Sequence, residues 1–468
     1  MNETYIQLQE DRATLTHPSD ISGGSVPAIP SKSHAHRLLI AAALSKDPCR
    51  LVCPATSKDI EATAACLSAM GARIERTEDG YFFYGVSATE SEDTAAPEDA
   101  AVPEDAVSGT PRQITLPVGE SGSTLRFLLP VVGALGRSAS FYMEGRLSER
   151  PLSPLYEEMC RHGVTLSPIG DNPLRISGQL TAGEYVIDGG VSSQYITGLL
   201  FALPLLKEDS RLVITGRLES APYVEITLQV LRQFGIRIEA EEQGGIIYNI
   251  SGGQQYHLTD DAPVCRVEGD WSNAAFFLSA GALLKQPVTV TGCNLHSPQG
   301  DRQILKLLKQ FGAEITAQES LSDPGLSDIT VVGGALKAAR IDARDIPDLV
   351  PILSVVATYA EGTTEIQNIE RLRIKESDRV ATVMEMLRNL GSSVELREKT
   401  PECGLTLRIT GREFLPGGTV SSYNDHRIAM AAAIASLRAN GPVEILQPMA
   451  VRKSYPGFYE DLVSILEK

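Results

Sequence analysis

The sequence has few of the residues that mark several protein classes. It holds seven cysteines in 468 residues, with no C-x-x-C pair and no Cys/His cluster at zinc spacing. We therefore expect neither a disulfide framework nor a metal site. No run of about 18 uncharged apolar residues is present to span a bilayer. The first 20 residues lack the basic start and apolar core of a secretory signal, so we expect a cytoplasmic protein.

Positive charge is also scarce. The chain has 42 Lys and Arg against 59 Asp and Glu, a formal net charge of -17. Binding to a nucleic-acid backbone needs clustered Lys and Arg, so the average charge disfavours such a partner. The sequence also lacks a P-loop, a dinucleotide-binding glycine fingerprint and a G-x-S-x-G elbow. These absences disfavour nucleotide-driven and serine-hydrolase chemistry.

One segment, residues 87–112, differs from the rest in composition. It carries seven acidic residues and a single arginine, repeats P-E-D-A and contains no aromatic residue. Such a segment has little to bury, so it is expected to be a solvated loop inserted into a folded domain. An acidic docking tail is the alternative interpretation.

Five segments share an amphipathic helical pattern, a glycine and then a short β-branched run. Each has Leu or Met at helical spacing, and its glycine stands where a helix end favours positive φ. The segments are residues 59–75, 153–166, 223–239, 301–316 and 378–396, and a sixth copy begins at Phe458. A recurring supersecondary unit is the simplest explanation.

A second series of segments alternates with the first and is almost entirely apolar. A helix that is apolar all round is buried on all sides, so each unit should pair one interior helix with one half-exposed helix. The apolar segments begin at Ser33, Ser123, Ser193, Ser272, Asp348 and Asp425. Each start is a residue type that caps helices. Six such N-termini facing one cleft would make a site for anions.

Basic residues gather near the starts of these apolar helices and in nearby loops. A cation beside an apolar helix needs a partner, and Arg and Lys suit carboxylates and phosphates. The residues are Lys32, Arg37, Arg126, Arg146, Arg150, Lys375, Arg379, Arg427 and Lys453. Two carboxylates, Asp348 and Glu376, accompany them and are candidates for proton transfer, with ion pairing or helix capping as the structural alternative. The pattern predicts a small polyanionic substrate.

Six motifs in this order resemble the 5-enolpyruvylshikimate-3-phosphate synthase family of enolpyruvyl transferases. They are PSKSHAHR, ESGSTLRF, GRLSERP, VSSQY, RIKESDR and YNDHRIAM, and they spread from residue 30 to residue 430. The resemblance implies an α/β fold, a two-domain inside-out α/β barrel of six βαβαββ repeats, three per domain. The first domain would comprise residues 29–267 with the 87–112 insert, and the second residues 1–28 plus 268–468.

The resemblance also implies a reaction. The family transfers the enolpyruvyl group of phosphoenolpyruvate to the 5-hydroxyl of shikimate 3-phosphate and releases phosphate, through a tetrahedral intermediate and without metal or organic cofactor. Asp348 would accept the hydroxyl proton, Glu376 would protonate the methylene carbon, and Lys32 would assist. Such proteins are targets of the herbicide glyphosate, and we expect a monomer.

The same resemblance assigns the binding residues. Those for shikimate 3-phosphate are Lys32, Ser33, Arg37, Ser192, Ser193, Gln194, Ser220, Tyr223, Asp348 and Lys375. Those for phosphoenolpyruvate are Lys32, Gly122, Arg146, Gln194, Arg379, Arg427 and Lys453. This chain departs from many relatives at Glu120 and Arg371, where Asn is common. Glu120 is a candidate partner for a neighbouring Arg and would then alter the grip on phosphoenolpyruvate.

Two alternatives remain open. The sister transferase that acts on UDP-N-acetylglucosamine shares the fold and typically carries a reactive Cys in a loop of its first half. This chain has GRLSERP there and no Cys between Cys66 and Cys160. The second alternative is a non-enzymatic repeat scaffold whose charges are merely solvated, and it predicts no small-ligand site.

Overall fold

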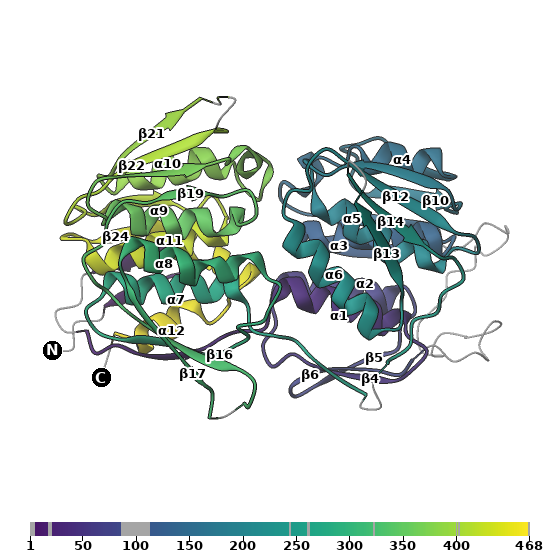
Figure 1. Ribbon diagram of the computed structural model, residues 1–468, viewed down its shortest axis with the longest axis horizontal. Helices are drawn as coiled ribbons and strands as arrows, with labels where there is room; N and C mark the ends of the chain where they lie inside the picture. The colour runs from purple at the N-terminus through teal and green to yellow at the C-terminus, as the bar shows by residue number, and fades with distance from the viewer. Residues whose placement is uncertain are drawn as a thin grey trace.

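The computed structural model describes residues 5–16, 21–85, 113–242, 245–259, 263–321, 323–398, 400 and 403–466. Within these ranges two lobes lie side by side (Figure 1). The acidic segment at 87–112 lies outside the described residues, so its assignment as a loop insert stays a prediction.

Six four-stranded sheets in the described residues share one topology. In each sheet one edge pair is parallel and the remaining pairs are antiparallel. In the first lobe the orders are β15 (Val264–Arg266), β4 (Cys49–Val52), β6 (Gly80–Phe83), β5 (Ile74–Thr77); β7 (Ile114–Gly119), β8 (Ala139–Met143), β10 (Leu174–Gly178), β9 (Val164–Leu166); and β11 (Glu184–Asp188), β12 (Ser210–Thr215), β14 (Ile246–Ile250), β13 (Ile238–Glu242). In the second lobe they are β3 (Gly24–Pro27), β16 (Val288–Cys293), β18 (Ser327–Val332), β17 (Glu314–Glu319); β19 (Arg340–Asp342), β20 (Thr363–Gln367), β22 (Thr406–Thr410), β21 (Ser393–Arg397); and β23 (Gly418–Ser421), β24 (Val443–Leu446), β2 (Arg12–Leu15), β1 (Ile6–Leu8). The predicted βαβαββ repeat is confirmed.

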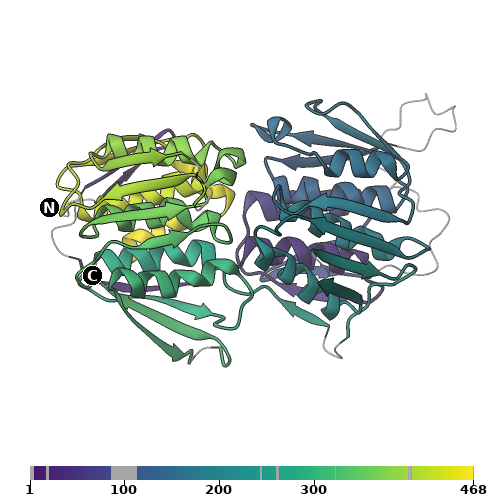
Figure 2. The same ribbon diagram turned by 45° about the horizontal axis from the view of Figure 1, so that its top comes forward.

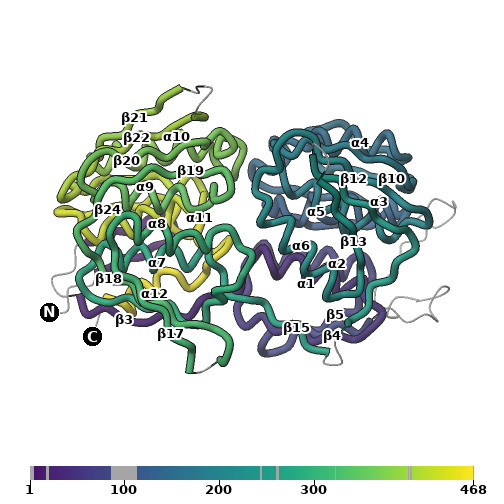
Figure 3. Tube along the Cα trace, viewed as in Figure 1, coloured from purple at the N-terminus to yellow at the C-terminus, as the bar shows by residue number. Residues whose placement is uncertain are grey.

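The chain crosses between the lobes at two places. Strand β3 pairs with β16 in the second lobe, and the chain then enters helix α1 (Lys32–Leu44) of the first lobe. Strand β15 pairs with β4 in the first lobe, and the chain then enters α7 (Trp271–Leu283) of the second. Figure 3 shows the two crossing segments near the junction of the lobes. Each crossing therefore joins a strand of one lobe to an interior helix of the other.

Six helices run through the interiors of the lobes, between the sheets (Figure 2). They are α1, α3 (Gly122–Ala134), α5 (Ser193–Ala202), α7, α9 (Val350–Thr358) and α11 (His426–Ala435). All 13 residues of α7 are buried, as an all-apolar helix requires. Side chains of Ser31, Ser121, Ser192, Asp270 and Asp425 accept backbone N–H groups of the first turns of five of them. The predicted caps were therefore placed one or two residues late in four helices and correctly at Asp425.

Asp348 does not cap a helix, contrary to expectation. It lies in a 3-10 turn, Pro347–Leu349, and α9 begins after it without a side-chain cap. Pro351 occupies the first turn of α9 and has no N–H for a cap to accept. The Asp348 carboxylate is thus free to face other side chains. The other 3-10 turns are Leu147–Glu149, Leu203–Leu205, Gly300–Gln303, Glu370–Ile374, Ser436–Arg438 and Pro448–Lys453.

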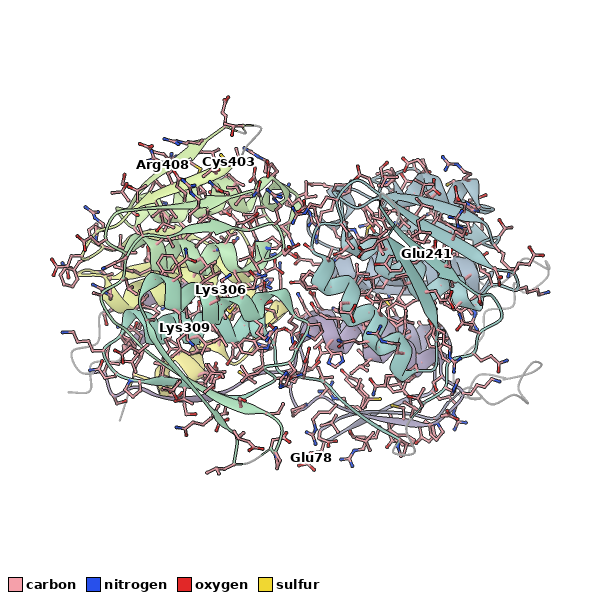
Figure 4. All side chains as sticks on the ribbon, in the orientation of Figure 1. Glu78, Glu241, Lys306, Lys309, Cys403 and Arg408 are labelled. Atoms are coloured by element: carbon pink, nitrogen blue, oxygen red, sulfur yellow. The ribbon has the colours of Figure 1, made fainter. Side chains whose placement is uncertain are left out.

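Six outer helices are half exposed, as their periodicity predicts. They are α2 (Lys58–Ala69), α4 (Leu155–Arg161), α6 (Ala221–Gln233), α8 (Ile304–Phe311), α10 (Arg379–Asn389) and α12 (Phe458–Ser464). On α8, Leu307 and Leu308 are buried, whereas Lys306 and Lys309 are exposed (Figure 4). The glycines that follow five of these helices all have positive φ, at positions 71, 163, 235, 312 and 391.

Each lobe has its own buried cluster. One cluster runs from Ala35 to Val267. The other combines Tyr5 to Val26 with Trp271 to Leu466. The α/β fold class, an inside-out two-domain arrangement of six repeats, is confirmed by this architecture.

Two of the helix-ending glycines in the first lobe make a matched pair for a stability test. Gly71 has φ of 93° and open space around a would-be Cβ, so Gly71→Ala should cost about 1 kcal/mol of backbone strain. Gly163 has φ of 97°, and its Cβ would lie 2.7 Å from the carbonyl oxygen of Gln179. Gly163→Ala should therefore lower the free energy of unfolding in urea clearly more than Gly71→Ala does. Equal losses would contradict this assignment.

Candidate active site

The first turns of five interior helices, and the 3-10 turn that precedes the sixth, α9, meet at one cleft between the lobes. The first lobe contributes Lys32, Ser33, Arg37, Ser123, Arg126, Phe127, Arg150, Pro151, Val191, Ser192, Ser193, Gln194, Tyr195, Ser220 and Tyr223. The second lobe contributes Asp270, Ser272, Asn273, Asp348, Arg371, Ile374, Lys375, Glu376, Arg379, His426, Arg427 and Ser454. The predicted meeting of helix N-termini at one cleft holds for five of the six helices, and it directs their N–H groups and positive dipole ends toward the cleft.

Arg37 is a buried cation held by neutral groups. Its guanidinium donates to the hydroxyls of Thr227 and Thr197 at 2.8 and 3.3 Å and to the carbonyls of Ser33 and Tyr223 at 2.6 and 2.9 Å. Burial lowers the pKa of Arg37, which reflects the cost of holding its charge away from water. These acceptors fix the side chain without cancelling its charge, so Arg37 is prepared to meet an anion.

Arg126 has the same kind of surroundings. It donates to the carbonyl of Pro151 at 3.0 Å and to Gln194 Oε1 at 3.2 Å, and burial lowers its pKa. Gly122 makes room for it, because a Cβ there would lie 2.5 Å from Arg126 Nη1 and 2.8 Å from Arg150 Nη1. A larger residue at 122 would therefore push two cations out of place.

The cations of the second lobe are instead bound to carboxylates. Arg379, only 1% exposed, lies 2.8 Å from Asp348, 2.7 Å from Glu376 and 2.8 Å from Asp425. Asp425 also caps α11 and accepts a hydrogen bond from Ser377. One guanidinium thus fixes both candidate proton-transfer carboxylates.

Asp348 forms ion pairs with three cations. Besides Arg379, it pairs with Arg427 at 3.2 Å and Lys375 at 3.4 Å. Burial would raise the pKa of Asp348, but the three cations outweigh it and hold that pKa well below its ordinary value. The carboxylate is therefore firmly ionised.

Glu376 is ionised for a similar reason. Burial raises its pKa, and Arg379 and Arg150 overcome burial and lower it well below the usual range. Arg150 reaches Glu376 from the opposite lobe, with 3.7 Å between Nη1 and Oε1. Neutralising either cation with a bound anion would raise the pKa of Glu376.

Lys32 stands opposite these carboxylates, at the start of α1. Burial lowers the pKa of Lys32, but Asp59, 2.8 Å away on α2, and Glu376 more than offset burial, so the pKa is raised. The Lys32 side chain is therefore a protonated donor at the cleft.

Three of the hydrogen bonds that join the lobes in the described residues lie around Ser220 and Tyr223. The Tyr223 hydroxyl donates to Asp348 at 3.4 Å, Arg371 donates to the Ser220 hydroxyl at 2.8 Å, and the Ser220 N–H donates to Asp345 at 3.2 Å. Arg371, noted as a departure from relatives, thus faces Ser220.

The structure brings most of the predicted site residues together. Lys32, Ser33, Arg37, Ser192, Ser193, Gln194, Ser220, Tyr223, Asp348, Lys375, Glu376, Arg379 and Arg427 all line the cleft. Gly122 lies behind Arg126 and Arg150. Arg146 does not line the cleft: its side chain is 59% exposed and pairs with Glu149, whereas Arg150 is 13% exposed and lines it.

Lys453 and Glu120 also differ from expectation. Lys453 does not line the cleft, and its ammonium lies 2.7 Å from Glu120. Glu120 therefore pairs with a lysine of the other lobe and not with a neighbouring Arg.

Several lining residues were missed by the sequence assignment. They are Arg126, Arg150, Asp270, Ser272, Asn273, His426 and Ser454. Arg126 and Arg150 were visible as cations near apolar helices. The polar residues of the WSN stretch at the start of α7 gave a usable signal too, since they open an all-apolar helix.

Known proteins resemble this chain over nearly its whole length. The family profile described as EPSP synthase (3-phosphoshikimate 1-carboxyvinyltransferase) matches residues 15–462. The chain belongs to the EPSP synthase family. A 3-phosphoshikimate 1-carboxyvinyltransferase of Clostridium kluyveri is 40% identical over 443 residues, 94% of this chain and 95% of the relative. One from Clostridium perfringens is 38% identical over 456 residues, 97% of this chain and 98% of the relative.

Solved structures also share the fold of this chain. The EPSP synthase from Acinetobacter baumannii matches with a TM-score of 0.75 and 24% identity, over 97% of this chain and 98% of that one. The enolpyruvyl transferase NikO from Streptomyces tendae matches with a TM-score of 0.70 and 20% identity, over 98% of both chains. The resemblance seen in the sequence motifs is confirmed.

The described residues contain no group of three or more His, Cys, Asp or Glu arranged to hold a metal ion. None of their helices is both long and apolar enough to traverse a bilayer.

Asp301 is a buried carboxyl beside the cleft. It accepts a hydrogen bond from Ser272, a lining residue, and its Oδ1 has no partner in the described structure. Burial and, to a lesser extent, the charge of Asp348 raise the pKa of Asp301 to about 7, against an ordinary value of 3.8. Below about pH 7 the folded protein therefore favours the protonated form of Asp301.

This raised pKa predicts a pH-dependent stability. Stability contributed by protonated Asp301 is fully present below about pH 3.8 and is lost as pH rises through about 7. Asp301→Asn keeps the neutral form at every pH, so the wild type should lose stability relative to this variant between pH 4 and pH 8. Urea unfolding at several pH values measures the difference. Parallel pH profiles would contradict the prediction.

Proposed function

We propose that this chain transfers the enolpyruvyl group of phosphoenolpyruvate to the 5-hydroxyl of shikimate 3-phosphate and releases phosphate. The observation that carries the proposal is the asymmetry of the cleft. One wall presents Arg37 and Arg126, held by neutral groups, and the other presents two ionised carboxylates in a cationic frame. Two anionic substrates match the first wall, and proton transfer between them matches the second.

For shikimate 3-phosphate we propose a subsite built largely from the first lobe. Its residues are Lys32, Ser33, Arg37, Ser192, Ser193, Gln194, Ser220 and Tyr223, with Asp348 and Lys375 from the second lobe. Serine hydroxyls and helix N-termini suit a phosphate, and the buried Arg37 suits a carboxylate. Lys375 now pairs with Asp348 at 3.4 Å. A substrate phosphate that engages Lys375 would loosen that pair.

For phosphoenolpyruvate we propose Arg150 in place of Arg146. The remaining residues are Lys32, Gln194, Arg379, Arg427 and Lys453, with Arg126 added and Gly122 giving room for the guanidinium groups. Arg150 is partly buried against Glu376, whereas Arg146 is exposed and paired with Glu149. A guanidinium at the cleft holds a phosphate or carboxylate in two places at once.

The proposed chemistry is addition followed by elimination, with no cofactor. Asp348 accepts the proton of the 5-hydroxyl group of shikimate 3-phosphate. The hydroxyl oxygen bonds to C2 of phosphoenolpyruvate, and C3 gains a proton from Glu376. The tetrahedral adduct then returns a proton from the new methyl group to the Glu376 carboxylate. The C–H electron pair forms the C2–C3 double bond as the C2–O bond to phosphate breaks and inorganic phosphate leaves. Lys32, protonated and close to Glu376, stabilises the departing phosphate.

The pKa directions indicate when this chemistry becomes possible. In the ligand-free cleft the pKa of Glu376 is too low for a proton donor, because Arg379 and Arg150 stabilise its charge. A phosphate bound to those arginines would offset their charge and raise the pKa of Glu376. Substrate binding would thus switch Glu376 from an ion-pair partner to an acid.

Two finer assignments complete the proposal. We place the division between the domains at the two crossings, with residues 29–267 in one and residues 1–28 plus 268–468 in the other, as the separate buried clusters support. We also propose a monomer in the cytoplasm.

Calorimetry tests the substrate: binding of shikimate 3-phosphate supports the proposal, and binding of UDP-N-acetylglucosamine in its place favours the sister transferase. Binding of neither favours a scaffold.

The two carboxylates should affect turnover more than binding. Asp348→Asn and Glu376→Gln remove the base and the acid but keep the side-chain shapes, so kcat should fall at least about 100-fold in each. The dissociation constant of shikimate 3-phosphate, measured by calorimetry, should change far less for Glu376→Gln. Near-normal turnover in both variants would contradict the assignment.

Arg150 and Arg146 provide a matched pair within one loop. Arg150→Met should lower kcat/KM for phosphoenolpyruvate about 10- to 100-fold, as expected for loss of hydrogen bonds to a charged ligand. Arg146→Met should leave it within about twofold, because an exposed ion pair contributes little. Steady-state kinetics decides between them, and the reverse order would restore Arg146 as the binding residue.

A further inference from the structure

An acid of the first lobe bonds to two residues of the second at the edge of the cleft. Glu120 lies in the turn directly before Ser121, the cap of α3. Its Oε2 accepts from Lys453 Nζ at 2.7 Å, and its Oε1 accepts from Asn424 Nδ2 at 3.2 Å. Both carboxylate oxygens are thus engaged by the opposite lobe.

The surroundings hold this carboxylate in place. Gly145 lies against it, since a Cβ there would come within 2.7 Å of Glu120 Oε2. On the other side, the carbonyl oxygen of Asn424 accepts a second hydrogen bond from Lys453 at 2.6 Å. The side chains are partly shielded, with Lys453 10% and Glu120 30% exposed. The pair is therefore less screened by solvent than a surface ion pair.

The ammonium group of Lys453 has one N–H donor that none of the described hydrogen bonds uses. A lysine has three N–H donors, and Lys453 uses one on Glu120 and one on Asn424. The next residue, Ser454, lines the cleft. Lys453 itself lines the recess beside the cleft, and an anionic ligand that reaches it can take the third donor.

The bond links the two lobes directly, because its partners belong to different lobes. A second cross-cleft pair, Arg150 with Glu376 at 3.7 Å, has the opposite polarity, with the cation on the first lobe. A bound anion competes for Arg150, as argued above. Glu120 is itself an acid and is not a ligand for an anion, so its bond to Lys453 can persist when the cleft is filled.

We propose that Glu120 is a positioning residue that stabilises the closed arrangement of the lobes and presents Lys453 to an anionic ligand. The closing role stands on the cross-lobe bonds alone. The ligand role rests on the proposed function, in which the anion is phosphoenolpyruvate. Part of the free energy of closure then comes from the protein, and the second substrate meets a cleft that is already biased toward closure.

The matched variants are Glu120→Gln, Glu120→Asp and Glu144→Gln. Gln removes the charge but keeps the length, and Asp keeps the charge with a shorter reach. Glu144 lines the same small recess outside the cleft as Glu120 and Lys453, and it is exposed. Its replacement changes local charge equally without removing a described cross-lobe bond.

The closing role is tested without ligand. Small-angle X-ray scattering at low salt should give a larger radius of gyration for Glu120→Gln than for wild type or Glu144→Gln, with Glu120→Asp between them. Added salt should expand the wild type more than Glu120→Gln, because only the wild type loses the Lys453–Glu120 pair to screening, while both share the Arg150–Glu376 pair. Identical scattering from wild type and Glu120→Gln would overturn the closing role.

The ligand role is tested with both substrates. In the presence of shikimate 3-phosphate, KM for phosphoenolpyruvate should rise about fivefold in Glu120→Gln, a typical effect for loss of one partly shielded ion pair. At saturation kcat should change less than about twofold, and Glu120→Asp should recover part of the loss. An unchanged or lower KM would overturn this role. If the wild type does not turn over these substrates, the proposed function fails, and the scattering result still decides the closing role.

Discussion

The second lobe's side of the cleft depends on the ion pairs that the buried guanidinium of Arg379 makes with three carboxylates. A cation that is 1% exposed must be compensated, and here three carboxylates compensate it within 2.8 Å. Asp425 is one of them and also fixes the start of α11. Removing the guanidinium would leave Asp348, Glu376 and Asp425 without their shared partner. The positions of Asp348 and Glu376 therefore depend on one buried charge, while Arg427 and Lys375 beside Asp348, and Arg150 beside Glu376, help to hold their pKa values low.

The first lobe handles buried charge differently, and the contrast explains why the cleft is suited to anions. Arg37 donates to hydroxyl and carbonyl oxygens, which orient the guanidinium but leave its charge intact. A ligand anion can therefore bind there without displacing a protein carboxylate. In the second lobe an anion must first weaken an existing ion pair, and this exchange alters the pKa of the carboxylate that is released. Anion binding on the first wall is thus independent of the carboxylates, whereas on the second wall it is coupled to their pKa values.

The sequence predicts the repeats well because they depend on local physics. Apolar periodicity marks interior and outer helices, and glycine marks the helix ends where φ is positive. The directions of side chains at the site are harder to predict from the sequence, because they depend on short turns. Arg146 and Arg150 flank one 3-10 turn, Leu147–Glu149, and only Arg150 faces the cleft. Spacing alone does not separate them. The pairing of Glu120 with Lys453 depends on how the two lobes meet, and no local pattern encodes that.

The crossings between the lobes add a final constraint. Asp270 caps α7 through the N–H of Asn273 at 2.8 Å, and its other oxygen accepts the N–H of Lys32 at 3.1 Å. One buried carboxylate therefore ties the first turns of α1 and α7, which belong to different lobes. A hinge motion at the crossings would leave Lys32 close to the second lobe, because this bond lies at the pivot. Lys32 is thus held at the junction of the lobes by the crossing itself, independently of the ion pairs that Arg150 and Lys453 make across the cleft.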